Sequence, residues 1–206
     1  MIFKGDTSKP PATPPPDDGS FNLVFGCGHI DYSPWGLKNV DIRNNFPHIH
    51  FPLVDVGKKL PWPDKTVDCI IAESILEHIP HGFWESGVCY SVSHLKTVSV
   101  LSDWCRVLKP GGMVAIKVPN IRGLIVQYLK KNIKPHEFWM YLYGGQEYKE
   151  NTHLSGFDPE MLTDVMTLAG FTDIKIVNCH DWEQNLSADT AWEMTGIGYR
   201  KGEQDG

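Results

Sequence analysis

The sequence has no long apolar run, no paired-cysteine spacing and no excess of positive charge. None of its apolar stretches approaches the roughly 18–20 residues of a membrane-spanning helix, which argues against an integral membrane protein. The five cysteines include no Cys-x-x-Cys pair, so we expect buried free thiols rather than a disulfide framework or a zinc site. The formal net charge of −6 disfavours a general binder of nucleic acids or membrane surfaces.

The beginning of the chain also lacks the basic-then-apolar layout of a signal peptide, so we expect a cytoplasmic protein. Residues 1–20 are instead rich in proline, a composition that cannot bury a core and predicts a flexible arm. The rest of the chain has the balance of a soluble globular protein, with 41% hydrophobic and 21% charged residues overall. We expect one domain over residues 21–200 and a short tail at 201–206.

The glycine-rich turn within residues 21–30 is the feature around which the chain is organised. Residues 23–25 (Leu-Val-Phe) predict a short buried strand, and residues 26–28 (Gly-Cys-Gly) follow it directly. Glycine adopts positive φ and lets a ligand approach the main chain closely. In an open α/β sheet, the end of the first strand borders the usual cofactor crevice. A Gly-x-Gly turn also occurs without any ligand. Other features of the sequence are therefore needed to distinguish a cofactor-binding turn from a purely structural one.

Apolar segments alternate with helical patterns along the rest of the chain. Further strands are predicted at 40–42, 51–56, 67–72, 113–118, 174–177 and 192–199, and helices at 73–79, 95–108, 120–132 and 158–169. This alternation predicts an α/β fold with a Rossmann-like, doubly wound, mostly parallel seven-stranded sheet, an antiparallel edge and helices on both faces. Residues 81–94 are expected to form an insertion. The aromatic-rich residues 134–153 are expected to form a lid or, equally well, a small satellite core.

Two aspartates follow predicted strands near the expected crevice. Asp41 lies at the end of the second strand, where a carboxylate can accept hydrogen bonds from both hydroxyls of a ribose. Asp55 lies at the end of the third predicted strand. The plain alternative for Asp41 is a solvated carboxylate in a turn.

Four stretches together resemble the class I S-adenosylmethionine-dependent methyltransferases, although each is weak evidence alone. They are Phe-Gly-Cys-Gly at 25–28, Val-Asp at 40–41, Leu-Pro-Trp-Pro-Asp at 60–64 running into the strand at 67–70, and Leu-Glu-His-Ile at 76–79 followed by Arg-Val-Leu-Lys-Pro-Gly-Gly at 106–112. Their order and spacing are most similar to the small type-11 branch, whose members are often linked to sugar and cell-surface biosynthesis. Two departures are Ile30 in place of a third glycine and Val24 in place of an acidic residue within the first strand.

The resemblance implies S-adenosylmethionine as the cofactor. The turn at 26–28 would lie along its methionine part, Asp41 at the ribose hydroxyls, and Asp55 with the Val56 backbone at the adenine edge. Glu73 or Ser74 would face the methionine amine or the acceptor. The complete set of predicted cofactor-binding residues is Phe25, Gly26, Cys27, Gly28, Asp41, Ile42, Asp55, Val56, Glu73, Ser74 and His78.

Methyl transfer from a sulfonium requires alignment, and also a base if the acceptor is a hydroxyl. The base candidates are His153 first, then His78, Glu77 and Tyr148. A structural or surface role explains any single histidine more readily than catalysis does, and His78 is better explained as bracing its helix. The predicted function is therefore methyl transfer to a small-molecule or sugar-like acceptor.

Three alternatives compete with this prediction. The first is a non-catalytic methyltransferase-like subunit that binds a partner. A nicotinamide-dependent enzyme is disfavoured because no Gly-x-Gly-x-x-Gly opens a full helix. A nucleic-acid acceptor is disfavoured by the net charge and because no Asn/Asp-Pro-Pro-Tyr-like motif follows the strand at 67–72.

Overall fold

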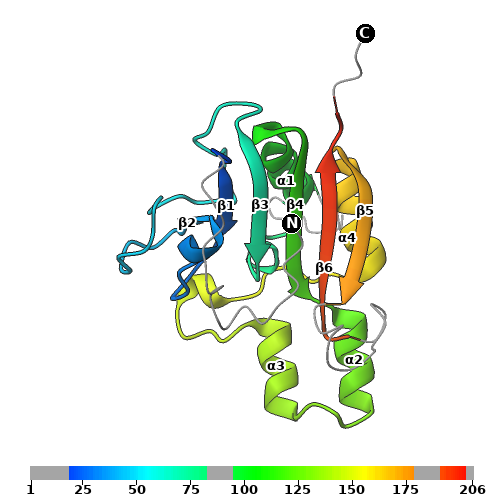
Figure 1. Ribbon diagram of the computed structural model, residues 1–206. Helices are drawn as coiled ribbons and strands as arrows, with labels where there is room; N and C mark the ends of the chain where they lie inside the picture. The colour runs from blue at the N-terminus through cyan, green and yellow to red at the C-terminus, as the bar shows by residue number, and fades with distance from the viewer. Residues whose placement is uncertain (1–18, 83–94, 179–190, 203–206) are drawn as a thin grey trace.

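The computed structural model describes residues 19–82, 95–178 and 191–202 (Figure 1). The predicted arm at 1–20 lies outside the described residues except for its last two. The predicted insertion at 81–94 lies outside the described residues except for residues 81 and 82. The predicted tail at 201–206 lies outside them except for residues 201 and 202.

The described strands form a single mixed sheet in the order β2-β1-β3-β4-β6-β5. They are β1 (Asn22–Phe25), β2 (Lys38–Val40), β3 (Val67–Glu73), β4 (Leu108–Pro119), β5 (Phe171–Asn178) and β6 (Glu193–Arg200). Strands β1 to β4 pair in parallel, whereas β6 runs antiparallel to both β4 and β5. The predicted α/β class, the mostly parallel sheet and its antiparallel edge are therefore confirmed.

The predicted strand at 51–56 is wrong, and the sheet has six strands rather than seven over the described ranges. Phe51 makes one isolated bridge with Val40, and the chain then turns away. Pro52 has no backbone N–H to donate to a ladder, and Leu53 adopts a left-handed φ of 60°. Phe51, Val54 and Val56 pack against the core without joining the sheet, whereas Leu53 is exposed. Their hydrophobic pattern therefore comes from packing and not from strand pairing.

The described helices are α1 (Leu95–Val107), α2 (Ile121–Leu129), α3 (Pro135–Tyr143) and α4 (Pro159–Leu168), with 3₁₀ turns η1 (Ser33–Trp35), η2 (Leu76–His78) and η3 (Lys149–Asn151). The helix predicted at 158–169 is confirmed as α4, and its N-cap Asp158 accepts a hydrogen bond of 2.8 Å from the Met161 N–H. Of the helix predicted at 73–79, only the 3₁₀ turn η2 is present. Ser74 has a φ of 52°, which separates β3 from η2, and Pro80 follows the turn.

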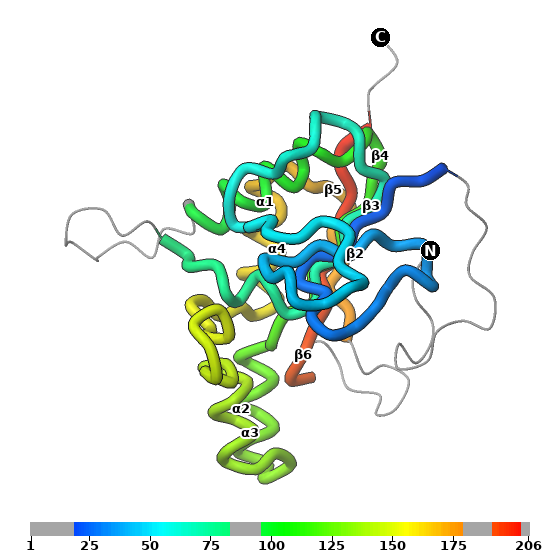
Figure 2. Tube along the Cα trace, turned by 90° about the vertical axis from the view of Figure 1, so that its left-hand side faces the viewer, coloured from blue at the N-terminus to red at the C-terminus, as the bar shows by residue number. Residues whose placement is uncertain are grey.

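Helices α1 and α4 cover one face of the sheet (Figures 1 and 2). The largest fully buried side chain, Trp104 of α1, packs edge-on against Phe25 of β1 with ring centroids 5.0 Å apart. On the opposite face, Tyr32 and Leu37 on either side of η1 pack against Val24 and neighbouring apolar side chains. The prediction of helices on both faces is therefore wrong over the described residues. There, α-helices cover one face, and a loop with a 3₁₀ turn covers the other.

Helices α2 and α3 lie side by side beyond the carboxyl end of the parallel strands, as both views show (Figures 1 and 2). Tyr128 and Phe138 stack between them, with ring centroids 4.4 Å apart. Helix α3 and η3 occupy the segment predicted as a lid or satellite core. Over the described part of the chain, no helix combines the length and apolar character needed to cross a bilayer.

Candidate functional site

The turn after β1 has the backbone geometry that its glycines predict. Gly26 and Gly28 have φ values of 69° and 58°, and the Gly26 N–H donates to the Val40 carbonyl at 2.9 Å. A Cβ atom on Gly26 would lie 2.0 Å from Cδ1 of Ile75. Gly26 is therefore required both by its left-handed conformation and by the close approach of Ile75.

The Asp41 carboxylate is buried beside this turn and is fully hydrogen-bonded. Its Oδ2 accepts from the Gly28 N–H at 2.9 Å and from Nη2 of Arg43 at 3.1 Å. Its Oδ1 accepts from the Arg43 N–H at 2.9 Å and from Nε of Arg43 at 3.0 Å. Burial by itself would raise the pKa of Asp41, but the hydrogen bonds from Arg43 and Gly28 outweigh it, so the pKa is lowered. Four donors occupy the roughly four lone-pair positions of the carboxylate.

A cavity of about 260 Å³ opens at this edge of the sheet. Six predicted cofactor-binding residues line it, namely Gly26, Asp41, Ile42, Asp55, Val56 and His78. The sequence prediction missed the other lining residues, which are Val54, Gly57, Ile75, Ile79, Lys149, Glu150, Thr152 and Leu154. We call this cavity the crevice. The structure thus brings together residues from the ends of β1 and β2, the 54–57 loop, η2 and the segment around η3.

The loop at 54–57 is held by a hydrogen bond from α1 and carries the Asp55 carboxylate at the crevice. The indole Nε1 of Trp104 donates to the Val56 carbonyl at 2.9 Å. Asp55 accepts from the Gly57 N–H at 3.0 Å and pairs with Nζ of Lys58 at 3.1 Å. The Asp55 side chain is 38% exposed, so its carboxylate keeps access to solvent and to a ligand.

Five predicted cofactor residues do not line the crevice, namely Phe25, Cys27, Gly28, Glu73 and Ser74. Phe25 is a core residue, stacked on Trp62. Burial and the nearby Asp41 raise the pKa of the Cys27 thiol to about 12, so it remains protonated. Glu73 accepts a hydrogen bond of 2.9 Å from the Tyr32 hydroxyl. Burial, and then this carboxylate, raise the pKa of Tyr32.

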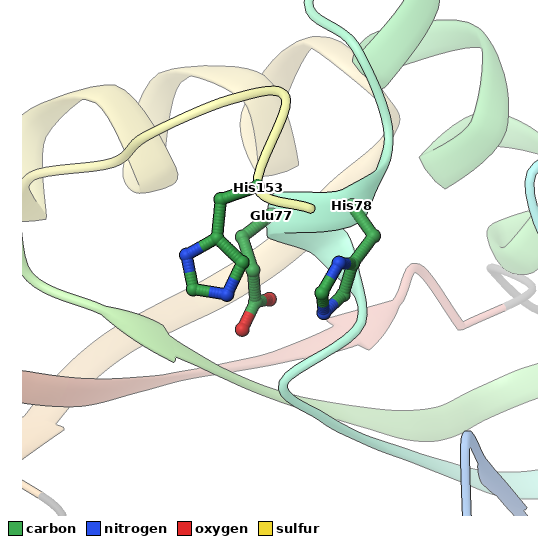
Figure 3. Close-up of side chains that lie close together, drawn as sticks. All are labelled: Glu77, His78 and His153. Carbon is green, nitrogen blue, oxygen red and sulfur yellow. The ribbon is translucent and has the colours of Figure 1, made fainter. Parts of the chain in front are cut away.

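Three of the four base candidates gather in one cluster (Figure 3). One ligand atom from each of Glu77, His78 and His153 lies within 4.8 Å of the other two, and the imidazole rings meet edge-on with centroids 4.9 Å apart. Burial raises the pKa of Glu77 to about 8 and lowers the pKa of both histidines below their ordinary value. The sequence prediction named all three residues but not their proximity.

The fourth candidate, Tyr148, lies apart from this cluster. Its ring is exposed and lies 5.6 Å from the Arg43 guanidinium, and its hydroxyl accepts a hydrogen bond of 3.4 Å from Nη1 of that arginine. The sequence prediction did not single out Arg43. Its place two residues after Asp41 was the available signal, and that spacing alone does not show that its side chain folds back.

The sheet is mostly parallel and is closed by an antiparallel strand, and a glycine turn and acidic residues lie at the crevice. Residues 26–116 match the family model described as "Methyltransferase domain", of type 11. This match confirms the resemblance to the S-adenosylmethionine-dependent methyltransferases and their type-11 branch, and it indicates S-adenosylmethionine as the cofactor.

Solved structures of low sequence identity share the fold. A methyltransferase of Thermotoga maritima, described as a possible histamine N-methyltransferase, is 17% identical, with 88% of this chain and 82% of that chain covered and a TM-score of 0.54. A methyltransferase of Archaeoglobus fulgidus is 16% identical, with 88% and 87% covered and a TM-score of 0.55. A phosphoethanolamine N-methyltransferase of Haemonchus contortus is 15% identical, with 93% and 50% covered and a TM-score of 0.54. No curated protein matches the chain significantly in sequence.

Proposed function

We propose that this chain transfers a methyl group from S-adenosylmethionine to a small-molecule acceptor, with sugar-like hydroxyl compounds as the first class to test. The observation that carries the proposal is the crevice at the carboxyl ends of β1 and β2, where Gly26, Asp41 and Asp55 meet. This is the edge at which open α/β sheets bind their cofactors.

The residues of the crevice fit the chemistry of the cofactor. Ile42, Val54 and Ile79 supply apolar walls suited to an adenine ring, and Asp55 supplies an acceptor for its exocyclic amine. Gly26 lines the crevice and has no side chain, so its main chain is accessible to the methionine part. The volume of about 260 Å³ lies just below the roughly 300–1,000 Å³ of typical ligand pockets.

Asp41 can hold the ribose hydroxyls only after Arg43 moves, because four N–H groups already bind its carboxylate. In our proposal the Arg43 guanidinium swings out toward Tyr148, whose ring it already faces. The backbone donors from Gly28 and Arg43 then still hold Asp41 in place. Cys27, Gly28, Glu73 and Ser74 would border the methionine end of the bound cofactor.

The cofactor supplies a sulfonium methyl group, which is already activated for displacement. The protein then has to align the acceptor and, for a hydroxyl, deal with its proton. We assign this role to the cluster of Glu77, His78 and His153, because His78 also lines the crevice and neutral imidazoles accept protons. Tyr148 is the second candidate.

One observation favours the alternative of a non-catalytic binding subunit, namely the complete hydrogen bonding of Asp41 by groups of the protein itself. The two functions are separated by incubating the protein with S-adenosylmethionine and panels of monosaccharides, sugar phosphates, amines and phosphorylated amines, and then measuring S-adenosylhomocysteine. We expect product with one acceptor class and none with Asp41→Ala. Absence of product from every class, together with no binding of S-adenosylhomocysteine, would support the binding subunit.

A further inference from the structure

The side chains of Glu77, His78 and His153 converge on one point although they come from segments far apart in the chain. Glu77 and His78 belong to η2 after β3, whereas His153 follows η3. Figure 3 shows the Glu77 carboxylate close to the two imidazole rings, which meet edge-on with centroids 4.9 Å apart. One ligand atom of each residue lies within 4.8 Å of the others.

The Glu77 carboxyl group has no hydrogen-bonding partner from another residue in the part of the chain that the structure describes. The residue is only 1% exposed, and neither Oε1 nor Oε2 has such a partner. Burying an unpaired carboxyl group is costly, and such a group in a folded protein indicates a ligand, a water or an ion that belongs there. The two histidines of the cluster indicate which of these three the Glu77 carboxyl group would bind.

Both histidines have the hydrogen bonding of metal ligands. Nδ1 of His78 lies 3.0 Å from the Thr152 carbonyl, and Nδ1 of His153 lies 2.9 Å from the Tyr141 carbonyl. Because a carbonyl only accepts, the Nδ1 atom of His153 carries the proton, and its neutral ring then has its lone pair on Nε2. The His78 ring also hydrogen-bonds the Ser74 backbone, a contact that it has to give up before its second nitrogen can bind a metal. A backbone carbonyl that fixes one ring nitrogen in this way is the usual outer partner of a metal-bound histidine.

The backbone holds the two segments of the cluster together. The Glu77 carbonyl accepts from the N–H groups of Leu154 at 2.8 Å and Ser155 at 3.0 Å, and the His153 N–H donates to the Tyr143 carbonyl at 3.1 Å. These bonds fix the relative positions of the two backbone segments before any ligand arrives. A tetrahedral metal about 2.1 Å from each ligand atom would hold these atoms roughly 3.4 Å apart, so the side chains have to move closer together when the metal binds.

We propose that Glu77, His78 and His153 bind a divalent transition-metal ion, for which zinc is the first probe. Two imidazole nitrogens and one carboxylate oxygen form a ligand set typical of zinc sites that keep an open position. Because His78 also lines the crevice, water or an oxygen atom of the acceptor would fill that position. This last role rests on the proposed function, whereas metal binding itself does not. With the metal bound, the histidine lone pairs are ligands and no longer free bases.

The test is a calorimetric titration of the full chain with ZnCl₂ after removal of metal by a chelator. We expect one zinc ion per chain. Glu77→Gln, His78→Gln and His153→Gln should each weaken binding by about 100-fold or more, since even the loss of an outer partner costs roughly 10–100-fold. His136→Asn removes an exposed histidine of α3 and should leave the affinity unchanged.

A second measurement keeps the test decisive if a variant fails to fold, as judged by circular dichroism. Co²⁺ added to the metal-free wild type should give the visible absorption of a low-coordinate site, and Zn²⁺ should abolish it. The proposal is overturned if the wild type binds no zinc, or if the folded variants bind it as the wild type does. Binding of S-adenosylhomocysteine is measured in parallel. Binding of S-adenosylhomocysteine without binding of zinc would refute the metal site alone. Binding of zinc without binding of S-adenosylhomocysteine would refute the proposed function alone.

Discussion

Arg43 binds the Asp41 carboxylate through two side-chain nitrogens, with Nε 3.0 Å from Oδ1 and Nη2 3.1 Å from Oδ2. Together with the backbone N–H groups of Arg43 and Gly28, this arrangement leaves the carboxylate no free acceptor position. Arg43 therefore occupies the place that the proposed function gives to the ribose hydroxyls.

Replacing Arg43 with glutamine should tighten the binding of S-adenosylhomocysteine several-fold. A ligand that binds only when the Arg43 guanidinium is displaced has a reduced apparent affinity, because Asp41 is still covered in a fraction of the free molecules. The variant lacks the guanidinium, so this reduction disappears. Calorimetric titration measures the change. Arg122→Gln is the control, because Arg122 pairs with Asp158 and Glu160 and does not line the crevice. Weaker binding by Arg43→Gln would mean that Arg43 contacts the cofactor instead of competing with it.

Asp41 should make the stability of the protein depend on pH at acid values. Its pKa is lowered in the folded state, so its contribution is fully present above the unfolded pKa of about 3.9 and is lost as the pH falls through the folded pKa. Asp41→Asn should therefore reduce the free energy of unfolding by about 1–3 kcal/mol at pH 7, and by progressively less below about pH 4. Urea unfolding at pH 7, 4 and 3 tests this, and a deficit that stays constant with pH would contradict it.

Gly26→Ala should both destabilise the protein and impair cofactor binding, whereas Gly111→Ala should only destabilise it. Both glycines have left-handed φ values, of 69° and 76°, and an alanine there costs about 1–2 kcal/mol. A Cβ on Gly26 also meets Ile75 at the crevice, but a Cβ on Gly111 has no neighbour within 4 Å. Thermal unfolding and S-adenosylhomocysteine titration of the two variants separate backbone strain from crowding. Equal affinities in the two variants would place the cofactor away from Gly26.

The strands and the glycine turn were predictable because their signals are local. A continuous apolar run such as that in β3 fits a strand buried in a parallel sheet, and glycines directly after β1 indicate positive φ. The stretch at 51–56 has the same apolar character but lies outside the sheet. Pro52 ends its pairing after one bridge, and most of its apolar side chains pack on the core from a loop. Hydrophobicity alone does not separate these two cases.

The arrangement of the site was less predictable because it depends on contacts between distant segments. The sequence identified Glu77, His78 and His153 as base candidates, but their convergence requires the backbone bonds between η2 and residues 154–155. Likewise, the return of the Arg43 side chain onto Asp41 depends on a chain path that no regular spacing describes. Periodicity places residues on helices and strands, whereas these pairings arise in irregular segments.

The proposed function requires that the crevice binds S-adenosylmethionine through Asp41. Calorimetric titration of the full chain with S-adenosylmethionine and S-adenosylhomocysteine, repeated on Asp41→Ala, tests this requirement. We predict clear binding of both ligands by the wild type and affinities at least about 100-fold weaker in the variant, because two hydrogen bonds to a charged group are lost. No binding by the folded wild type, or equal binding by the folded variant, would contradict the proposed function.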